Sequence, residues 1–173
     1  MIRNQKVRIA GVATESVVDG PGLRSVIFFQ GCPHACPGCH NPETWDPRGG
    51  HAYPLGEVIA QLKLNPLIQG VTLSGGEPFL QAGPVAVLAE FLKARGYNLW
   101  IYTGYVWEEL IQRLHEPAIK KILKNADVLV DGPFSEKARD LQLAFRGSTN
   151  QRLIRVHESM EQGKIINWVP AWQ

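Results

Sequence analysis

The sequence predicts an α/β protein with a parallel sheet and helices packed outside it. Short apolar runs alternate with amphipathic segments of roughly ten residues, which is the pattern of successive strands and helices in βαβ units. The run at 24–30 is apolar almost throughout, which is typical of a strand buried on both faces. Polar or glycine-rich clusters follow several predicted strands, at the edge where parallel α/β proteins build their sites. Together these observations predict right-handed βαβ crossovers around one core.

Apolar spacing and turn residues predict the elements of the first half of the chain. A rigid glycine- and proline-rich turn at 18–22 separates the first two strands, and the pair at 65–66 ends the first helix. Gly96 is the stop signal of the second helix. The expected elements are a strand at 6–13, a strand at 24–30, a helix at 54–62, a strand at 70–73 and a helix at 84–95.

The same signals continue through the second half, where Pro117 breaks one helical stripe. The expected elements are a strand at 98–102, a helix at 107–114, a short helix around 119–123, a strand at 127–130 and two late strands at 152–156 and 164–169. No internal repeat, low-complexity segment or linker interrupts the pattern, and 173 residues fall within the size of one domain. Residues 1–173 are therefore expected to form a single domain.

Charge and composition argue against several classes of function. Eighteen Lys and Arg against sixteen Asp and Glu give a charge of +2, too weak a bias to predict a nucleic-acid partner. The start has no apolar segment after its basic residues, and the longest apolar stretch is interrupted by Glu90, so we expect neither a signal peptide nor a membrane span. The three cysteines lie too close together to link distant segments. They suit a metal in a reducing compartment, which predicts a cytoplasmic protein.

All cysteines of the chain lie in the glycine- and proline-rich stretch 31–45 with the spacing C-x3-C-x2-C, as Cys32, Cys36 and Cys39. Inert buried thiols are usually scattered through a core, so this clustering favours a metal. With a neighbouring histidine, His34 or His40, the thiolates would complete a structural zinc tetrahedron. They would instead hold three irons of a 4Fe–4S cluster and leave the fourth iron open to a ligand. The spacing alone leaves both alternatives open.

Three further clusters follow predicted strands, and each also has an ordinary structural interpretation. The stretch 74–78 would be a tight strand-to-helix turn, Thr103 a strand end and Asp131 a turn cap. In the functional interpretation, the bare glycine backbone of 74–78 admits a ligand while Glu77 offers a carboxylate to an ammonium or hydroxyl group. Topology brings these clusters and the cysteines to one edge of the sheet, which favours the functional interpretation.

Several motifs resemble the radical S-adenosylmethionine (SAM) superfamily, and within it the glycyl-radical-enzyme activases. The cysteine spacing after one buried strand and the Gly-Gly-Glu triplet after the next resemble the superfamily as a whole. The resemblance is closest to the activating proteins of anaerobic ribonucleoside-triphosphate reductases and covers residues 10–156. The motifs that carry it are VDGPG at 18–22, FFQGC at 28–32, CPGCHNPETW at 36–45, YTGY at 102–105, DGPF at 131–134 and FRGSTNQ at 145–151.

The resemblance implies a reaction and a set of site residues. Cys32, Cys36 and Cys39 would hold a 4Fe–4S cluster, whose fourth iron the amino and carboxylate groups of SAM would chelate. The cluster, reduced by flavodoxin or ferredoxin, would cleave SAM to methionine and a 5′-deoxyadenosyl radical, which would take a hydrogen atom from a glycine of the reductase. The residues expected to contact SAM are Gly38, Cys39 and His40 on the adenine side, Ser74, Gly75, Gly76 and Glu77 at the methionyl end, and Thr103 and Asp131 near the ribose, the carboxylate or a bound cation.

The chain departs from the wider superfamily in two respects. Gly38 stands where most members carry an aromatic residue, a feature that the reductase activases share. The chain also has fewer βα units than the superfamily usually has, so we expect a shortened, open partial barrel whose edge would admit a glycine loop of the partner. The alternatives are an activase of another glycyl radical enzyme, such as pyruvate formate-lyase, and a non-catalytic Cys3His zinc module. The arginine-rich stretch 146–155 is expected to face the partner.

Overall fold

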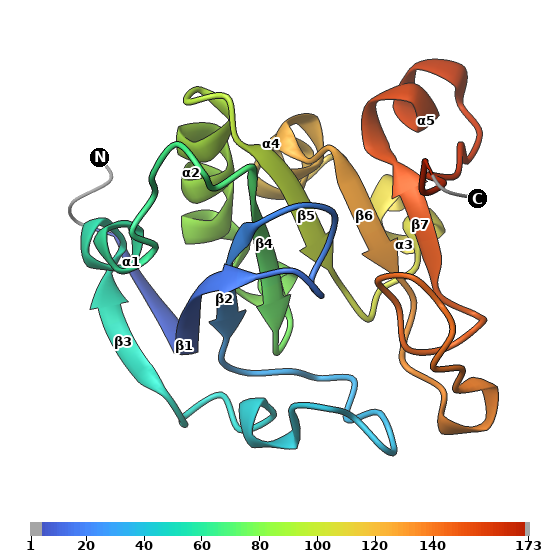
Figure 1. Ribbon diagram of the computed structural model, residues 1–173, viewed down its shortest axis with the longest axis horizontal. Coiled ribbons are helices and arrows are strands. Elements are labelled where there is room, and N and C mark those ends of the chain that lie inside the picture. Colours follow the sequence, from blue (N-terminus) through green and yellow to red (C-terminus); the bar gives the residue numbers. More distant parts are fainter. Residues whose placement is uncertain (1–4, 172–173) are drawn as a thin grey trace.

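The computed structural model describes residues 5–171, which contain one seven-stranded sheet (Figure 1). Its strands are β1 (Lys6–Ser16), β2 (Arg24–Phe29), β3 (His51–Pro54), β4 (Gly70–Gly75), β5 (Asn98–Tyr102), β6 (Val128–Asp131) and β7 (Arg152–Arg155). They follow the order β3-β1-β2-β4-β5-β6-β7 across the sheet. The central strands β2, β4, β5 and β6 run parallel, whereas β1 is antiparallel to both β2 and β3, and β7 is antiparallel to β6.

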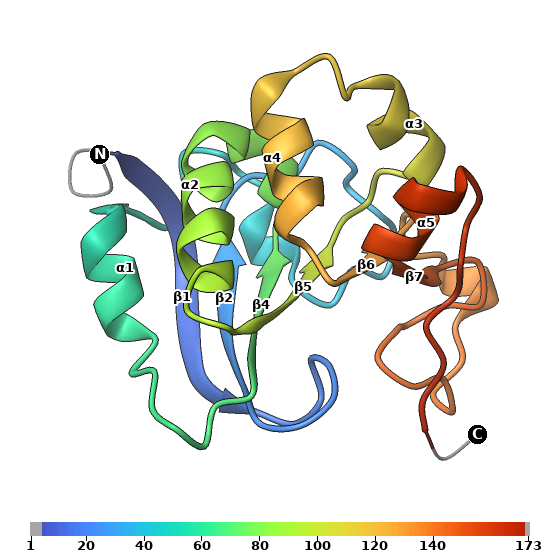
Figure 2. The same ribbon diagram turned by 90° about the horizontal axis from the view of Figure 1, so that it is seen from above.

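The helices lie along the outer side of the curved sheet (Figure 2). They are α1 (Leu55–Gln61), α2 (Ala82–Lys93), α3 (Trp107–Gln112), α4 (Pro117–Asn125) and α5 (Val156–Gln162). Alternate residues of a strand point to opposite faces, so Leu99 and Ile101 of β5 join the main core under the helices while Trp100 faces inward. Within residues 5–171 no helix is long and apolar enough to cross a membrane.

The predicted fold class is confirmed, since a mostly parallel sheet carries helices on its outside. The two edge strands of the order, β3 and β7, lie at opposite ends of the sheet. The sheet is therefore curved but open, as expected for a shortened partial barrel.

The edges of the sheet differ from the sequence prediction. The prediction omits β3, because its four residues are exposed or half-buried and show no alternation. It also omits α5, where Val156 and Ser159 are buried without a longer apolar stripe. Residues 164–169, predicted as a strand, form one isolated bridge between Asn167 and Ile154. The left-handed Gly163 ends α5 and turns the chain back along β7. There Arg155 N–H donates to the Ile166 carbonyl at 2.8 Å and Trp168 N–H to the Leu153 carbonyl at 2.7 Å, so the segment pairs with β7 over too few residues to form a strand.

The turn between β1 and β2 is held against the inner face by a buried arginine. Arg24 is 1% exposed, and all the oxygens that accept its hydrogen bonds are uncharged, including Thr72 Oγ1 at 2.8 Å and the Asn98 carbonyl at 3.0 Å. Burial lowers the pKa of this guanidinium to about 10. The Thr72 hydroxyl in turn donates to the Asp19 carbonyl at 2.7 Å. These bonds place Asp19 close to the site described next.

Candidate functional site

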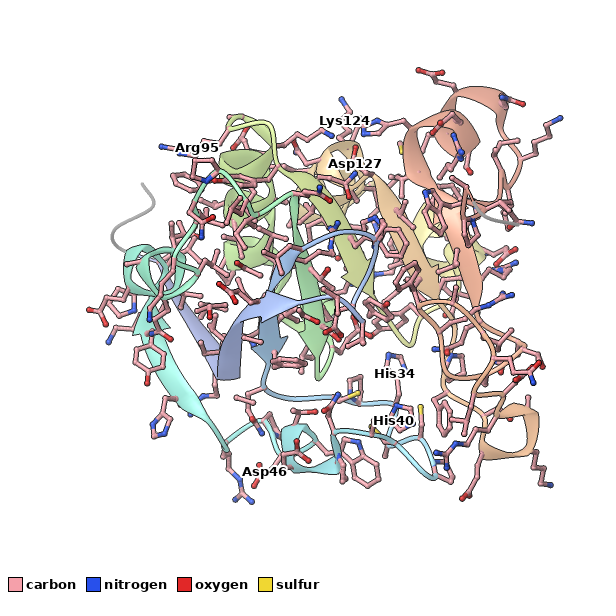
Figure 3. The ribbon with its side chains drawn as sticks, viewed as in Figure 1. His34, His40, Asp46, Arg95, Lys124 and Asp127 are labelled. Atoms are coloured by element: carbon pink, nitrogen blue, oxygen red, sulfur yellow. The ribbon has the colours of Figure 1, made fainter. Side chains whose placement is uncertain are left out.

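A cavity of about 330 Å³ lies at the carboxyl ends of the parallel strands. The cysteine loop, residues 31–45, follows β2 and crosses beneath these strand ends (Figure 1). His34 and His40 on this loop both lie below the strand ends in the view of Figure 3, and both line the cavity. The predicted site residues that line the cavity are Cys32, Cys36, Cys39, His40, Ser74, Gly75, Gly76 and Thr103.

The cysteine loop is tied to its own ends by backbone hydrogen bonds. Gly31 N–H donates to the Thr44 carbonyl at 2.7 Å, and Cys32 N–H donates to the Trp45 carbonyl at 3.1 Å. The buried Gln30 amide donates to the carbonyls of residues 43 and 46 at 3.0 and 2.7 Å. These bonds join the two ends of the loop, and the three cysteines between those ends line the cavity.

The three cysteines are free thiols of intermediate exposure. Burial raises the pKa of Cys32 and of Cys36 above the ordinary thiol value, and the nearby Glu77 charge adds to this shift. A metal must therefore displace the thiol protons to bind. Within the described part of the chain, no group of three or more His, Cys, Asp or Glu side chains surrounds one point where a single ion would sit. All three thiols line the same cavity, and in a 4Fe–4S cluster each cysteine binds a different iron, so the donor set of this cavity fits such a cluster.

Gly75 and Gly76 have the structural role that the ordinary interpretation of 74–78 expected, and they also line the cavity. Gly75 has φ +85°, and a Cβ there would lie 2.6 Å from the Phe28 backbone; at Gly76 it would lie 2.4 Å from the Gly31 carbonyl oxygen. The backbone of this segment also bonds to β2 and the cysteine loop, through Gly76 N–H to Phe29 O and Glu77 N–H to Gly31 O, both at 2.8 Å. The glycines therefore permit close contact between two strand ends as well as lining the cavity.

Glu77 lies outside the cavity wall, with a fully buried side chain. Its carboxylate accepts hydrogen bonds from His34 Nε2 at 2.8 Å and from Gly104 N–H at 2.9 Å. The Thr103 hydroxyl lies 3.0 and 2.9 Å from its two oxygens, and Phe79 N–H donates to Oε1 at 3.0 Å. Both oxygens of the side chain predicted to meet the ligand therefore accept hydrogen bonds from the protein itself.

Asp131 is likewise fully buried and does not line the cavity. Arg152 donates to its two oxygens through Nε at 3.0 Å and Nη2 at 2.5 Å, and Trp107 N–H donates at 2.7 Å. A second carboxylate, Glu108, holds the same guanidinium from outside. These contacts join β6, β7 and the start of α3, so Asp131 is occupied in the same way as Glu77.

Gly38 also lies behind the cavity wall. Its φ is +74°, and a Cβ there would meet Phe134 and Glu136 at 3.2 Å, so this glycine lets the cysteine loop pack on the segment after β6. Phe134 itself lines the cavity, and its ring centroid lies 5.1 Å from that of His40. The adenine side of the predicted site thus has an aromatic wall, although not from the residue before Cys39.

The structure adds lining residues that the sequence prediction missed. Tyr102 and Gly104 flank Thr103, so the strand-end argument that found Thr103 applies equally to them. His34 was considered only as a zinc ligand. The remaining additions were marked only by the motifs of the family resemblance; they are Phe28 of β2, Asn41 of the cysteine loop, and Asp19, Phe134, Gly147 and Gln151 on other loops.

Comparisons with known proteins agree with this site. A family model described as a 4Fe-4S single cluster domain matches residues 18–154. The anaerobic ribonucleoside-triphosphate reductase-activating protein of Enterobacteria phage T4 is 37% identical over 79% of this chain and 86% of its own length. The protein of that name in Vibrio cholerae is 37% identical over 80% and 92%, and the one in Escherichia coli K12 is 34% identical over 78% and 90%. A crystal structure of QueE from Escherichia coli covers 60% of this chain and 54% of its own, with a TM-score of 0.43 and 21% identity.

These matches define a protein with a single 4Fe–4S cluster domain, which supports the iron–sulfur interpretation of the cysteine loop. The chain belongs to the family of anaerobic ribonucleoside-triphosphate reductase-activating proteins.

Proposed function

We propose that this protein is a radical SAM activase that generates a glycyl radical on an anaerobic ribonucleoside-triphosphate reductase. The observation that carries the proposal is that Cys32, Cys36 and Cys39 line one cavity together with the ends of β4 and β5. The names of the relatives supply the partner. When bound and reduced, the cluster supplies the electron that splits SAM into methionine and a 5′-deoxyadenosyl radical, which takes a hydrogen atom from the partner's glycine and leaves as 5′-deoxyadenosine.

Different cavity residues would bind the cluster, the methionyl end of SAM and its adenine. The three cysteines would each bind one iron. Ser74, Gly75 and Gly76 would present backbone and hydroxyl groups to the methionyl end, with the Thr103 hydroxyl beside them. His40 and Phe134 would form the wall against the adenine, and Gly38 would support Phe134 from behind.

The protein must also keep a carbon radical away from water and from unintended hydrogen donors. Two other loops supply part of this enclosure: the turn at 17–23 contributes Asp19 to the cavity lining, and the segment 145–151 contributes Gly147 and Gln151. The partner would complete the enclosure when its glycine loop enters through the open edge of the barrel.

Anaerobic reconstitution tests the proposal directly. Protein loaded with iron and sulfide should be brown, hold about four irons per chain, and lose most of them when Cys36→Ala removes one ligand. Under dithionite it should convert SAM to 5′-deoxyadenosine. Colourless protein with one tightly bound zinc per chain, or an intact reducible cluster that leaves SAM uncleaved, would overturn the proposal.

Electron paramagnetic resonance tests the choice of partner. Mixed with SAM, reductant and the anaerobic reductase, the activase should produce a glycyl radical signal on the reductase. Pyruvate formate-lyase is the matched control, since its activases share the Cys39–Trp45 motif. A signal on the lyase alone would overturn the assignment.

The arginines expected to face the partner are largely engaged within the protein. Arg152 pairs with Asp131 and Glu108, and Arg155 pairs with Glu158 at 3.4 Å. Arg146 donates to the Gln151 carbonyl at 2.6 Å. Charge reversal in this stretch would disturb the fold as well as a docking surface, so the partner surface stays a prediction.

A further inference from the structure

The Glu77 carboxylate is saturated by donors from two other loops and from its own turn. Four donors reach its two oxygens: the His34 ring, the Thr103 hydroxyl and the N–H groups of Phe79 and Gly104, all within 3.0 Å. A carboxylate offers about four lone-pair sites, so no acceptor capacity remains for a ligand. The side chain is also 0% exposed, and His34, Thr103 and Gly104 separate it from the cavity they line.

His34 is the partner that the cysteine loop contributes to this network. It lies between Cys32 and Cys36, and its ring sits edge-on to Tyr105 with centroids 4.7 Å apart. The ring rests on the backbone at Gly104, where a Cβ would lie 2.3 Å from His34 Cδ2. The absence of a side chain at position 104 therefore makes room for the imidazole.

The segment between Cys32 and Cys36 needs an anchor of this kind. It has no helix or strand, and Ala35 has φ +44°, a left-handed conformation that costs free energy for a residue with a Cβ. Interactions elsewhere must hold such a backbone in place. The hydrogen bond from His34 to a buried carboxylate at the rigid end of β4 supplies one.

We propose that His34 and Glu77 are positioning residues of the cluster. His34 fixes the Cys32–Cys36 half of the loop against the ends of β4 and β5, and Glu77 acts on the cluster through His34 instead of binding SAM. The inference rests on the proposed function only in that the cysteines hold an iron–sulfur cluster. Outer partners that orient metal ligands typically contribute about 10- to 100-fold in metal affinity or activity.

Iron retention tests this role without requiring SAM cleavage or the reductase. Wild-type protein and the variants His34→Ala, His34→Gln and Glu77→Gln are reconstituted anaerobically, and iron release to bathophenanthroline is followed over time. His34→Ala should release iron about tenfold faster than wild type. His34→Gln should recover most of the loss, because its amide N–H can still donate to the carboxylate. The reduced cluster of His34→Ala should also show changed g-values and a shifted midpoint potential.

Gly104→Ala provides an independent approach, because it displaces the His34 ring without changing either hydrogen-bonding group. It should accelerate iron release as His34→Ala does, and the double variant should be no worse than the faster single variant, since both remove the same contact. His51→Gln is the matched control, because His51 is exposed on β3. This variant should retain iron as the wild type does. Thermal unfolding of the metal-free variants identifies any that fail to fold.

Wild-type iron release and g-values in both His34→Ala and Gly104→Ala would overturn the inference. Normal iron retention in Glu77→Gln together with weakened SAM binding would also overturn it, since that result assigns Glu77 to the ligand. If the iron-release differences hold but the wild-type cluster leaves SAM uncleaved, the proposed function fails and the positioning role stands.

Discussion

Two strand ends of this protein carry a buried acid beside a glycine, and the structure uses them differently. After β4, Glu77 accepts hydrogen bonds from the cysteine loop and from the end of β5. At the end of β6, Asp131 accepts from Arg152 of β7 and from the backbone at the start of α3. Both side chains are fully buried, and neither lines the cavity.

The partners of the two acids explain the difference. Asp131 accepts two hydrogen bonds from the planar guanidinium of Arg152 and so links β6 to β7 and α3. Its contacts therefore stabilise the edge of the sheet. Glu77 joins an irregular loop, so its contacts determine where two of the cysteines lie. Changes at the β6 end should alter global stability alone, whereas changes at the β4 end should also alter the metal site.

The largest expected effect comes from the glycines at the two strand ends. Gly75→Ala places a Cβ 2.6 Å from the Phe28 backbone at φ +85°, whereas Gly132→Ala, at φ +95°, meets nothing closer than 3.8 Å. The left-handed backbone costs about 1–2 kcal/mol in both, and overpacking adds about 1–3 kcal/mol at Gly75 alone. Denaturant unfolding of the metal-free protein measures the loss of unfolding free energy in each variant. Equal losses of unfolding free energy in Gly75→Ala and Gly132→Ala would contradict this prediction, because they would show that the end of β4 can move away from β2.

Arg152→Met tests the Asp131 ion pair. It leaves a buried carboxylate without its cation, and such a loss typically costs about 3–5 kcal/mol. Because the Arg152 side chain is 32% exposed, we expect the lower end of that range. Iron bound per folded chain should match wild type. Arg155→Met is the control on the same strand, and with an exposed partner it should change stability by less than about 1 kcal/mol.

Thr103→Val tests the corresponding contact at the β4 end. The isosteric change removes the hydroxyl that bridges the two Glu77 oxygens, which should cost about 1–3 kcal/mol because a buried acceptor loses its donor. Unlike Arg152→Met, it should also accelerate iron release. The exposed Thr149→Val should stay within about 0.5 kcal/mol of wild type. If Thr103→Val loses stability without releasing iron faster, the contacts at the β4 end contribute only to stability, as those at the β6 end do.

The smallest effect concerns the thiols of the metal-free protein. Burial raises the pKa of Cys32 and Cys36, and the Glu77 charge adds to both shifts, so these groups stay protonated to higher pH than a free thiol. Glu77→Gln removes the negative charge and should shift the pH profile of iodoacetamide alkylation to lower pH. Asp131→Asn should leave the profile unchanged, and an equal shift in both variants would contradict the distinction.

The central elements of the fold were predictable because apolar spacing reflects burial. The strand predicted at 98–102 matches β5, and the run at 24–30 matches β2 within one residue. Prediction failed where that signal is weak, as in the exposed edge strand β3 and the short α5 with few buried residues. The antiparallel direction of β1 and β7 depends on pairing across the sheet, which spacing along the chain does not record.

The cysteine loop and the strand ends that face it were determined by the sequence itself, because ligand spacing and apolar periodicity are properties of neighbouring residues. Only the tertiary structure decided which polar side chains face the cavity and which are occupied within the protein. Glu77 meets His34 from 43 positions away, and Asp131 meets Arg152 from 21. A buried carboxylate must take whatever donors the fold brings to it, so its role depends on those distant residues.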